Sequence, residues 1–251
     1  MRVAITGGGG FIGNHLHKLY PNADIFDVTH GKDICEQLPD VEYDKIFHLA
    51  AKHHIPTCEV EAEECIWINC WGTLNLIKSY PNARIISISS SAANEIKSVY
   101  GASKLFTEII GKLHKNYLSV RLYNVFGEGQ RPESGAVVPK LMDMCLRNLP
   151  LSIYGDGTQA RDFTYVGDVV ENLRTMMEGS LTGLTHLGYG DPLSVNELIK
   201  MVYGFMPEIE HMPARGVDIK FSRSPNPCKV YYGRAEGIKR TKEWFKKEYS
   251  L

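Results

Sequence analysis

Short apolar segments alternate along the first half of the chain with longer segments whose apolar residues recur at helical spacing. The predicted strands lie at 2–6, 24–28, 45–50, 84–89 and 119–124, and the predicted helices end near 20 and cover about 61–78 and 100–115. Strands that alternate with helices are typical of a parallel sheet with helices on both faces. We therefore predict an α/β fold of the Rossmann type, with a doubly wound parallel sheet.

The sequence Tyr-Pro-Asn-Ala occurs twice, at 20–23 and 80–83, each time between a predicted helix and a predicted strand. Proline cannot continue a helix and asparagine tolerates turn geometry, so both copies predict helix ends. We interpret the repeat as shared loop chemistry in two connections and not as a duplicated domain.

Prolines divide the chain into shorter pieces after about residue 130. Helical patterns remain at about 137–147, 168–178, 194–203 and 235–247. We predict a first domain over 1–130 and a small C-terminal lobe over 131–251, with about 160–190 returning to the first domain. The lobe is expected at the carboxyl edge of the sheet, where open α/β folds bind ligands.

The composition of the 251 residues, 43% hydrophobic and 23% charged with a net charge of −1, is that of an ordinary globular protein. No stripe of Lys and Arg stands out, which argues against nucleic acid and membrane surfaces as partners. No apolar run is long enough to span a bilayer, and the first residues do not resemble a signal peptide. The six cysteines form no Cys-x-x-Cys pair and the nine histidines have no zinc-site spacing, so we expect a cytoplasmic protein without a metal site.

Glycines at 7, 10 and 13 follow the first predicted strand directly and open the first helix. Glycine lets the backbone turn sharply and approach a pyrophosphate, whose charge meets the amides of the helix N-terminus. A glycine-rich turn without a ligand is the alternative, but the strand before and the helix after favour a dinucleotide site.

Asp27 ends the second predicted strand, where a carboxylate accepts hydrogen bonds from an adenosine ribose and repels a 2′-phosphate. This residue favours NAD over NADP, although a solvated charge at the end of a strand is the simpler alternative. Asp33 and Ile34 follow closely and could flank the adenine. Because five residues between Asp27 and Asp33 cannot hold a helix and another strand, we predict one strand fewer than usual on this side.

Tyr100 and Lys104 are four positions apart and share one face of a predicted helix. A lysine ammonium, together with the positive charge of a nicotinamide, can lower the pKa of a tyrosine so that it acts as a general acid and base. Serines at 89, 90 and 91 end the preceding strand and could hold a substrate oxygen beside Tyr100. Strand register favours Ser90 over Ser91 as this hydroxyl.

The chain resembles the extended short-chain dehydrogenases/reductases of the NAD-dependent nucleotide-sugar epimerase/dehydratase family, in particular UDP-galactose/UDP-glucose 4-epimerases. The matching motifs are TGGGGFIG at 6–13, HLAA at 48–51, NCWGTLNL at 69–76, SSSA at 89–92, YGASK at 100–104, RLYNVFGEGQ at 121–130 and YGDGTQARDFTYVGDVV at 154–170. They cover most of the chain and are more specific for the family than for one reaction.

The resemblance implies a role for individual residues. NAD would be bound by Gly7, Gly10, Phe11, Ile12, Gly13, Asp27, Asp33, Ile34, Leu49, Ala50, Ala51, Asn69, Tyr100, Lys104, Tyr123 and Val125. The nucleotide sugar would be bound by Asn124, Val138, Tyr154, Arg161 and Arg215, and the catalytic residues would be Ser90, Ser91, Tyr100 and Lys104. The match of SSSA at 89–92 favours Ser91 as the catalytic hydroxyl, whereas strand register favours Ser90. For Arg161, a phosphate clamp and a loop ion pair with Asp162 stay equally open.

Two departures from the family pattern bear on the reaction. Only ten positions separate Ser90 from Tyr100, where most members carry a longer lid segment. That spacing and HHIPTCE at 53–59 resemble membrane-associated UDP-N-acetylglucosamine 4,6-dehydratases. Ser91 and Ala92, however, stand where those enzymes carry Asp-Lys and where hexose 4,6-dehydratases carry Asp-Glu, so water elimination is disfavoured.

The resulting hypothesis is an NAD-dependent epimerase that inverts C4 of a UDP-hexose through a transient 4-keto intermediate. The alternatives are an NAD(P)-dependent reductase or dehydrogenase of a nucleotide ketosugar, a 4,6-dehydratase, and a non-catalytic NAD-binding scaffold, which the intact Tyr100–Lys104 pair disfavours. The resemblance also implies a homodimer through the helices at about 61–78 and 100–115. Apolar residues there fit a dimer and core packing equally well: Ile66, Ile68, Leu74, Leu105, Ile109 and Ile110.

Overall fold

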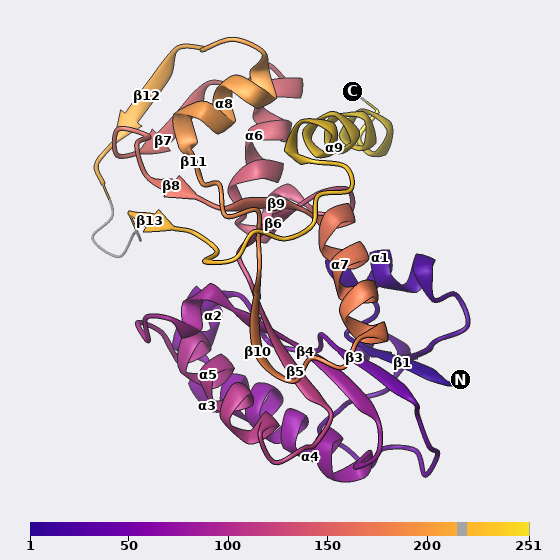
Figure 1. The fold of residues 1–251 in the computed structure, drawn as a ribbon. Coiled ribbons are helices and arrows are strands. Elements are labelled where there is room, and N and C mark those ends of the chain that lie inside the picture. Colours follow the sequence, from indigo (N-terminus) through magenta and orange to yellow (C-terminus); the bar gives the residue numbers. More distant parts are fainter. Residues whose placement is uncertain (215–219, 251) are drawn as a thin grey trace. The chain divides into compact units, whose positions relative to one another are not determined.

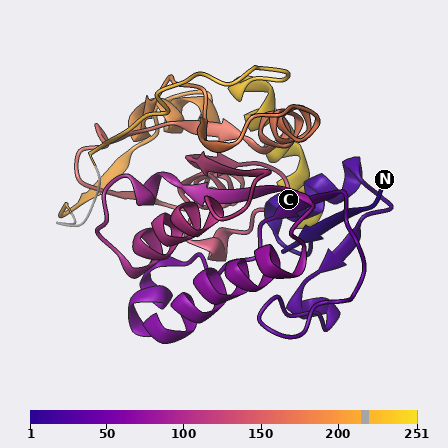
Figure 2. The same ribbon diagram turned by 60° about the horizontal axis from the view of Figure 1, so that its bottom comes forward.

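The structure, a computed structural model, describes residues 1–214 and 220–250. The chain forms two compact units (Figures 1 and 2). The first unit contains Met1–Leu122 and Asn172–His186, and the second contains Tyr123–Glu171 and Leu187–Leu251.

The first unit is built on a sheet of six strands in the order β10-β5-β4-β3-β1-β2. Its strands are β1 (Val3–Thr6), β2 (Asp24–Phe26), β3 (Lys45–His48), β4 (Arg84–Ser90), β5 (Tyr117–Leu122) and β10 (Gly183–Leu187). The pairs β1–β2, β1–β3, β3–β4 and β4–β5 are all parallel. This arrangement confirms the predicted Rossmann-type sheet.

Helices cover both faces of this sheet (Figure 1). One face carries α2 (Ile55–Val60), α3 (Ala62–Ile66), α4 (Gly72–Ser79) and α5 (Val99–Gly111), and the other carries α1 (Phe11–Leu19) and the end of α7 (Val166–Glu178). The helix predicted at 61–78 is divided into α3, the π-helical turn η2 (Trp67–Trp71) and α4, and the short helix α2 was not predicted.

β2 lies at the edge of the sheet, next to β1. The chain continues from β2 into the 3-10 turn η1 (Val28–His30) and next enters a strand of this sheet at β3, on the far side of β1. Among the described residues, no strand pairs with the outer edge of β2, as the short Asp27–Asp33 spacing predicted.

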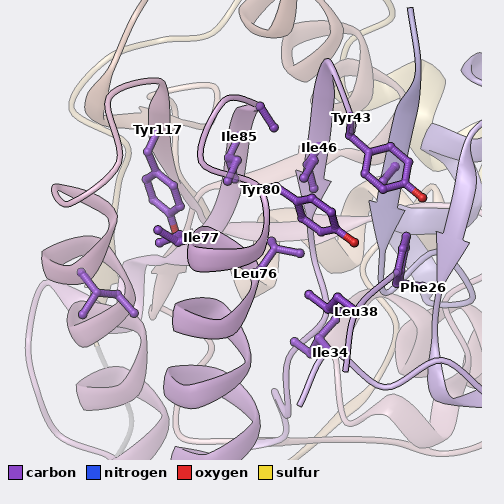
Figure 3. Close-up of a cluster of buried hydrophobic side chains, with 13 residues drawn as sticks. Phe26, Ile34, Leu38, Tyr43, Ile46, Leu76, Ile77, Tyr80, Ile85 and Tyr117 are labelled. Carbon is purple, nitrogen blue, oxygen red and sulfur yellow. The ribbon is translucent and has the colours of Figure 1, made fainter. Parts of the chain in front are cut away.

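A cluster of buried apolar side chains fills the space between the sheet and α4 and α5 (Figure 3). Tyr43 and Tyr80 meet edge to face in it, with ring centroids 5.2 Å apart. Their hydroxyls reach polar partners, since that of Tyr43 donates to the Asp24 carboxylate (2.8 Å) and that of Tyr80 donates to the Pro39 carbonyl (3.1 Å). Two tyrosines can therefore be buried here without leaving a hydroxyl unpaired.

The two Tyr-Pro-Asn-Ala segments adopt the same conformation. Tyr20 ends α1 with φ −125° and ψ 67°, and Tyr80 ends α4 with φ −127° and ψ 62°. In each copy the alanine N–H donates to the tyrosine carbonyl, at 3.0 Å in the first and 3.2 Å in the second. The prediction of shared loop chemistry is confirmed.

Among its described residues, the second unit has seven short strands in small separate sheets and three further helices. Its strand pairs join β6 (Asn124–Phe126) to β9 (Phe163–Tyr165), β7 (Leu151–Tyr154) to β12 (Ile209–Met212), and β8 (Ala160–Arg161) to β11 (Leu193–Ser194) and β13 (Phe221–Ser222). Its helices are α6 (Val137–Leu146), α8 (Val195–Tyr203) and α9 (Arg234–Glu248). Besides η1, the first unit has the 3-10 turn η3 (Ser91–Ala93), and the second unit has the 3-10 turn η4 (Pro132–Ser134). In the part of the chain that the structure covers, no helix has the length and apolar character needed to cross a membrane.

His48 ends β3 as a buried, neutral side chain. Its Nδ1 lies 2.7 Å from the Thr6 hydroxyl and its Nε2 lies 2.9 Å from the Thr73 hydroxyl. Burial, with a smaller contribution from the positive charge of Lys104, lowers the pKa of His48 to about 3. A charged imidazole at this position is therefore incompatible with the folded chain near neutral pH.

We predict that His48 makes the fold sensitive to acid. Between pH 6.5 and about 3, the unfolded chain binds a proton at this residue that the folded chain does not, so its contribution to stability falls as the pH falls. In urea unfolding, the free-energy difference between wild type and His48→Asn should narrow by roughly 1.4 kcal/mol per pH unit below pH 6.5. A difference that stays constant with pH would contradict this, and His30→Gln, at an exposed position, serves as the control.

Candidate active site

The loop between β1 and α1 requires glycine at two of the predicted positions. Gly7 has a φ of +69°, and a Cβ there would lie 2.7 Å from the backbone nitrogen of Ala50. A Cβ on Gly13 would lie 2.2 Å from the carbonyl oxygen of Gly7. Helix α1 begins at Phe11 behind Gly10, with no side-chain cap and no acidic residue in its first turn. The amides of this helix end are thus left to face an anion.

Asp27 links the end of β2 to the glycine loop. Its carboxylate accepts hydrogen bonds from the Gly9 N–H (2.9 Å), the Thr29 N–H (3.0 Å) and the Thr29 hydroxyl (2.6 Å). Burial raises the pKa of Asp27, but these hydrogen bonds outweigh it and hold the pKa below its usual value. The residue is therefore an anion with two fixed oxygens beside the loop.

Asp33 and Ile34 lie next to each other but face different surroundings. The Asp33 carboxylate accepts a hydrogen bond from the Cys35 N–H at 2.8 Å. The Ile34 side chain is buried in the core, against Gly72, where a Cβ would approach its Cδ1 to 2.6 Å. Only the backbone of Ile34 can therefore face a ligand outside the core.

Three further residues predicted to bind the cofactor follow β3. Leu49, Ala50 and Ala51 are half-buried there, and the N–H groups of Leu49 and Ala50 donate to the Thr6 hydroxyl at 3.2 and 3.1 Å. Because parallel strands end at one edge of a sheet, β1, β2, β3 and β4 bring Gly7, Asp27, Leu49 and Ser90 to the same edge.

Tyr100 lies in the first turn of α5, near the end of β4. Its hydroxyl shares a hydrogen bond with the Ser90 side chain. Ser90 also caps the turn η3 by accepting from the Ala92 N–H at 3.2 Å, whereas Ser91 begins that turn. The structure therefore brings Ser90 to Tyr100, in agreement with the strand register.

Lys104 is buried one helical turn after Tyr100. Its ammonium donates to the Ile88 carbonyl at 2.8 Å and lies 5.9 Å from the centroid of the Tyr100 ring. Burial lowers the pKa of Lys104 to about 8. Lys104 is thus held on the same face of α5 as the tyrosine that it was predicted to assist.

The expected lowering of the Tyr100 pKa by Lys104 is absent from the protein alone. Burial raises the pKa of Tyr100 to about 12, which the hydrogen bond with Ser90 only partly offsets. The ammonium of Lys104 does not offset this effect of burial on the pKa of Tyr100 in the protein alone.

A buried ion pair behind helix α5 was not predicted from the sequence. Arg121 on β5 binds both carboxylate oxygens of Glu108 on α5, at 2.7 and 2.6 Å. The hydroxyl of Ser89 donates to the same carboxylate at 2.5 Å, and Arg121 also donates to Asn94. The pair joins α5 to the end of β4 and to the loop before Tyr100. The signal that could have revealed it is a charged residue, Arg121, inside an apolar strand.

We predict that Glu108→Gln destabilises the first unit by about 3 kcal/mol, because it leaves the Arg121 guanidinium buried without a counter-charge. Glu108 and Arg121 are 7% and 12% exposed, so solvent screens them little. Chemical unfolding measures the loss, and Glu108→Gln combined with Arg121→Met should recover much of it. Asp143→Asn, which breaks a pair with Arg147 that is 22% and 40% exposed, should cost less than about 1 kcal/mol. Equal losses in the two single variants would contradict the prediction.

Asn69 lies within η2 and is 1% exposed. Its side-chain oxygen accepts from the Lys52 N–H (2.8 Å), and its side-chain nitrogen donates to the Lys52 carbonyl (3.0 Å) and the Ser103 hydroxyl (2.9 Å). These bonds use one acceptor and both donors of the amide. The side chain is therefore directed at the protein, between the loop after β3 and helix α5.

The second unit holds the other predicted residues, apart from Arg215, which lies outside the described residues. Tyr123 is buried, and Asn124 and Val125 follow it on β6, exposed and half-buried. Val138 is buried in α6, and Tyr154 is 39% exposed at the end of β7.

Arg161 on β8 is half-buried and donates to the Ala160 carbonyl at 3.0 Å. The neighbouring Asp162 is wholly buried. Its carboxylate accepts hydrogen bonds from the N–H groups of Tyr189 (3.0 Å), Gly190 (2.8 Å) and Ser224 (3.0 Å). Asp162 thus anchors the loops of this unit through their backbone, a role that the sequence did not reveal.

The sequence and the fold match known nucleotide-sugar enzymes over nearly their whole length. A protein of Methanocaldococcus jannaschii named "Putative UDP-glucose 4-epimerase" is 31% identical over 305 aligned positions, which include 97% of this chain and 98% of that protein. The structure of UDP-N-acetylglucosamine 4-epimerase from Methanobrevibacter ruminantium M1 in complex with UDP-N-acetylmuramic acid is 25% identical, with a TM-score of 0.88 over 98% of each chain. An NAD dependent NDP-hexosamine 5,6-dehydratase, TunA, of tunicamycin biosynthesis is 26% identical, with a TM-score of 0.84 over 98% of each chain.

A family profile decides the assignment. The profile of the NAD dependent epimerase/dehydratase family matches residues 3–185, from β1 to β10, and so includes the glycine loop, Ser90, Tyr100 and Lys104. This match covers more than half of the chain, and the chain therefore belongs to the NAD dependent epimerase/dehydratase family.

Proposed function

We propose that this protein is an NAD-dependent nucleotide-sugar epimerase that inverts C4 of a UDP-hexose. The observation that carries the proposal is the group of Tyr100, Lys104 and Ser90 at the end of β4, with Ser91 and Ala92 next to it. This group can move a proton to and from a hydroxyl, whereas no carboxylic acid follows Ser90 directly to assist loss of water.

The residues at the carboxyl edge of the first-unit sheet fit NAD. Gly7 and Gly13 lie too close to neighbouring backbone to carry a side chain, and the tight turn that they allow brings the first amides of α1 to a position where they can face a pyrophosphate. The Asp27 carboxylate is fixed beside this loop and suits the two hydroxyls of an adenosine ribose. The same charge repels a 2′-phosphate, which favours NAD over NADP.

The bound dinucleotide would supply a hydride acceptor for C4, then a hydride donor to the opposite face of the 4-keto sugar, and in its oxidised form a positive nicotinamide ring. Tyr100 removes the proton of the sugar 4-hydroxyl, and Ser90 donates a hydrogen bond to the same oxygen as negative charge develops there. Lys104 and the ring charge together lower the pKa of Tyr100 from the value of about 12 that burial sets in the protein alone. The reverse proton transfer from Tyr100 completes the cycle after the 4-keto sugar has turned.

The proposed substrate contacts lie in the second unit. Arg161 and Arg215 would bind the diphosphate as cations, with Asn124 donating to it, and Val138 and Tyr154 would contact the nucleotide or the sugar. A nucleotide sugar is favoured as the partner because the relatives are named for UDP-sugars.

We predict that Tyr100→Phe lowers kcat for the interconversion of UDP-glucose and UDP-galactose by about 100-fold or more, because the general acid and base is lost. The change with time in the ratio of UDP-galactose to UDP-glucose, measured by NMR, gives the rate. Tyr80→Phe, which removes another hydrogen-bonded hydroxyl of the first unit, is the matched control and should leave kcat unchanged. Full activity of Tyr100→Phe would contradict the proposed mechanism.

The amount of dinucleotide consumed during turnover distinguishes an epimerase from a reductase. An epimerase regenerates NAD in each cycle, so the purified protein should turn over without added dinucleotide. Consumption of one NAD(P)H for each sugar converted would favour the reductase alternative. Formation of an unsaturated or 6-deoxy-4-keto product would favour a dehydratase.

We also propose that the enzyme is a homodimer through α3, η2 and α5. Large apolar side chains are exposed on these contacting elements, with exposures of 37–51%: Ile66, Trp67, Trp71, Phe106 and Ile109. The rings of Trp67 and Trp71 stack with centroids 5.4 Å apart. An exposed apolar patch of this kind is typical of an interface. Of the six residues predicted at the interface, Ile66 and Ile109 are exposed and Ile110 is buried in the core.

The dimer is tested by Ile109→Glu, which places a charge in the patch at a position that is 51% exposed. We predict that its mass in solution falls from twice the chain mass to 28.2 kDa, measured by light scattering after gel filtration. Leu149→Glu, at an exposed leucine of the second unit, should remain dimeric. A wild-type protein of 28.2 kDa would contradict the dimer.

A further inference from the structure

Five buried polar side chains connect the glycine loop to the catalytic helix through the interior of the first unit. They are Thr6, His48, Thr73, Asn69 and Ser103, all at most 4% exposed, and we call them the polar chain. They come from β1, β3, α4, η2 and α5. A run of polar groups in this position calls for an explanation, because apolar side chains could fill the same space.

The first half of the polar chain has a defined direction. The Thr73 hydroxyl donates to the Asn69 carbonyl at 2.5 Å, so at His48 it must accept. His48 therefore carries its proton on Nε2, and its Nδ1 accepts from the Thr6 hydroxyl. The Thr6 hydroxyl in turn accepts from the amides after β3. The donors and acceptors of Thr6, His48 and Thr73 are therefore all defined. This pattern requires a neutral His48, because its Nδ1 must accept a hydrogen bond.

Asn69 is the junction of the second half. Its amide holds both the N–H and the carbonyl of Lys52, directly after the proposed cofactor groove at 49–51. It also donates to Ser103, whose hydroxyl donates to the Tyr100 carbonyl at 2.8 Å. The polar chain thus ends on the backbone of the catalytic tyrosine and on the backbone of the groove.

The π-helical turn explains how Asn69 reaches both Lys52 and Ser103. In η2 the Gly72 N–H donates to the Trp67 carbonyl, five residues back, so the turn around Asn69 is wider than in an α-helix. The Thr73 hydroxyl donates to the Asn69 carbonyl, and the Asn69 side chain faces Lys52 and Ser103. Turns of this kind occur often at functional sites.

We infer that Asn69 is a positioning residue, which acts through Ser103 and Lys52 to fix Tyr100 relative to the cofactor groove. The inference rests on the proposed function for the identity of the groove and of the catalytic tyrosine. It differs from the expected direct contact of Asn69 with NAD, because the amide is buried and three of its bonds go to protein atoms. Asparagine is required, since aspartate cannot donate and leucine can neither donate nor accept.

The test compares Ser103→Ala, Asn69→Asp and the double variant with wild type. Ser103→Ala cuts only the link to Tyr100, so we expect kcat to fall about 10-fold while the Kd for NAD, measured by calorimetry, stays within about twofold. Asn69→Asp removes both donors, so we expect kcat to fall and the Kd for NAD to rise, each about 10-fold. Because both changes break the same link, the double variant should have the kcat of Asn69→Asp alone.

A readout without substrate accompanies these rates. In wild type, NAD should slow amide hydrogen exchange in the segment 99–104, because the polar chain transmits order from the groove to α5. This slowing should be lost in Ser103→Ala and Asn69→Asp. Thr241→Ala, which removes a buried hydroxyl bound to the Gly237 carbonyl of α9, is the matched control and should retain it.

The outcomes distinguish the inference from the proposed function. In one outcome, NAD binds and slows hydrogen exchange in wild type and variants alike, and the variants keep the kcat of wild type. This outcome overturns the positioning role and leaves the proposed function intact. Additive losses in the double variant also overturn it. A wild type that binds no NAD overturns the proposed function itself. If Asn69→Asp does not fold, Ser103→Ala decides the result, because alanine is well suited to a helix.

Discussion

Desolvation of the Tyr100–Lys104 pair is the constraint on which the site depends. Burial moves the two pKa values toward their neutral forms, to about 12 for the tyrosine and about 8 for the lysine. The protein alone therefore holds a phenol that does not ionise near neutral pH. A cationic ring beside the phenol would change this, which ties proton transfer to the presence of the cofactor. Such a site would be inactive until it is loaded.

The surrounding structure keeps the pair in place with buried polar groups. Glu108 and Arg121 fix α5 against β4 and β5 on one side, and the polar chain fixes it against η2 and the loop after β3 on the other. Both sets cross between elements far apart in the sequence. Removing one partner from either set should lower the free energy of unfolding, because each broken bond leaves a buried polar group without a partner.

The chain has 251 residues, whereas its match to the Methanocaldococcus jannaschii protein runs over 305 aligned positions. After β2, the turn η1 leads toward β3, and no described strand extends the sheet beyond β2. The turn η3 and the loop held by Asn94 connect Ser90 to Tyr100. Neither connection includes the glycine loop or Lys104.

The sequence by itself determined five of the six strands of the sheet, the glycine loop, the repeated helix ends and the pairing of Tyr100 with Lys104, whereas β10 was not predicted. These features are local, because strand alternation, glycine conformations and a four-residue helical spacing depend on residues close together in the sequence. Only the tertiary structure decided that Asn69 faces Lys52 and Ser103, that Glu108 meets Arg121, that Ile34 belongs to the core, and that burial raises the pKa of Tyr100. Each of these depends on contacts between distant segments or on the exclusion of water. Periodicity cannot reveal either, because both arise only when the elements pack.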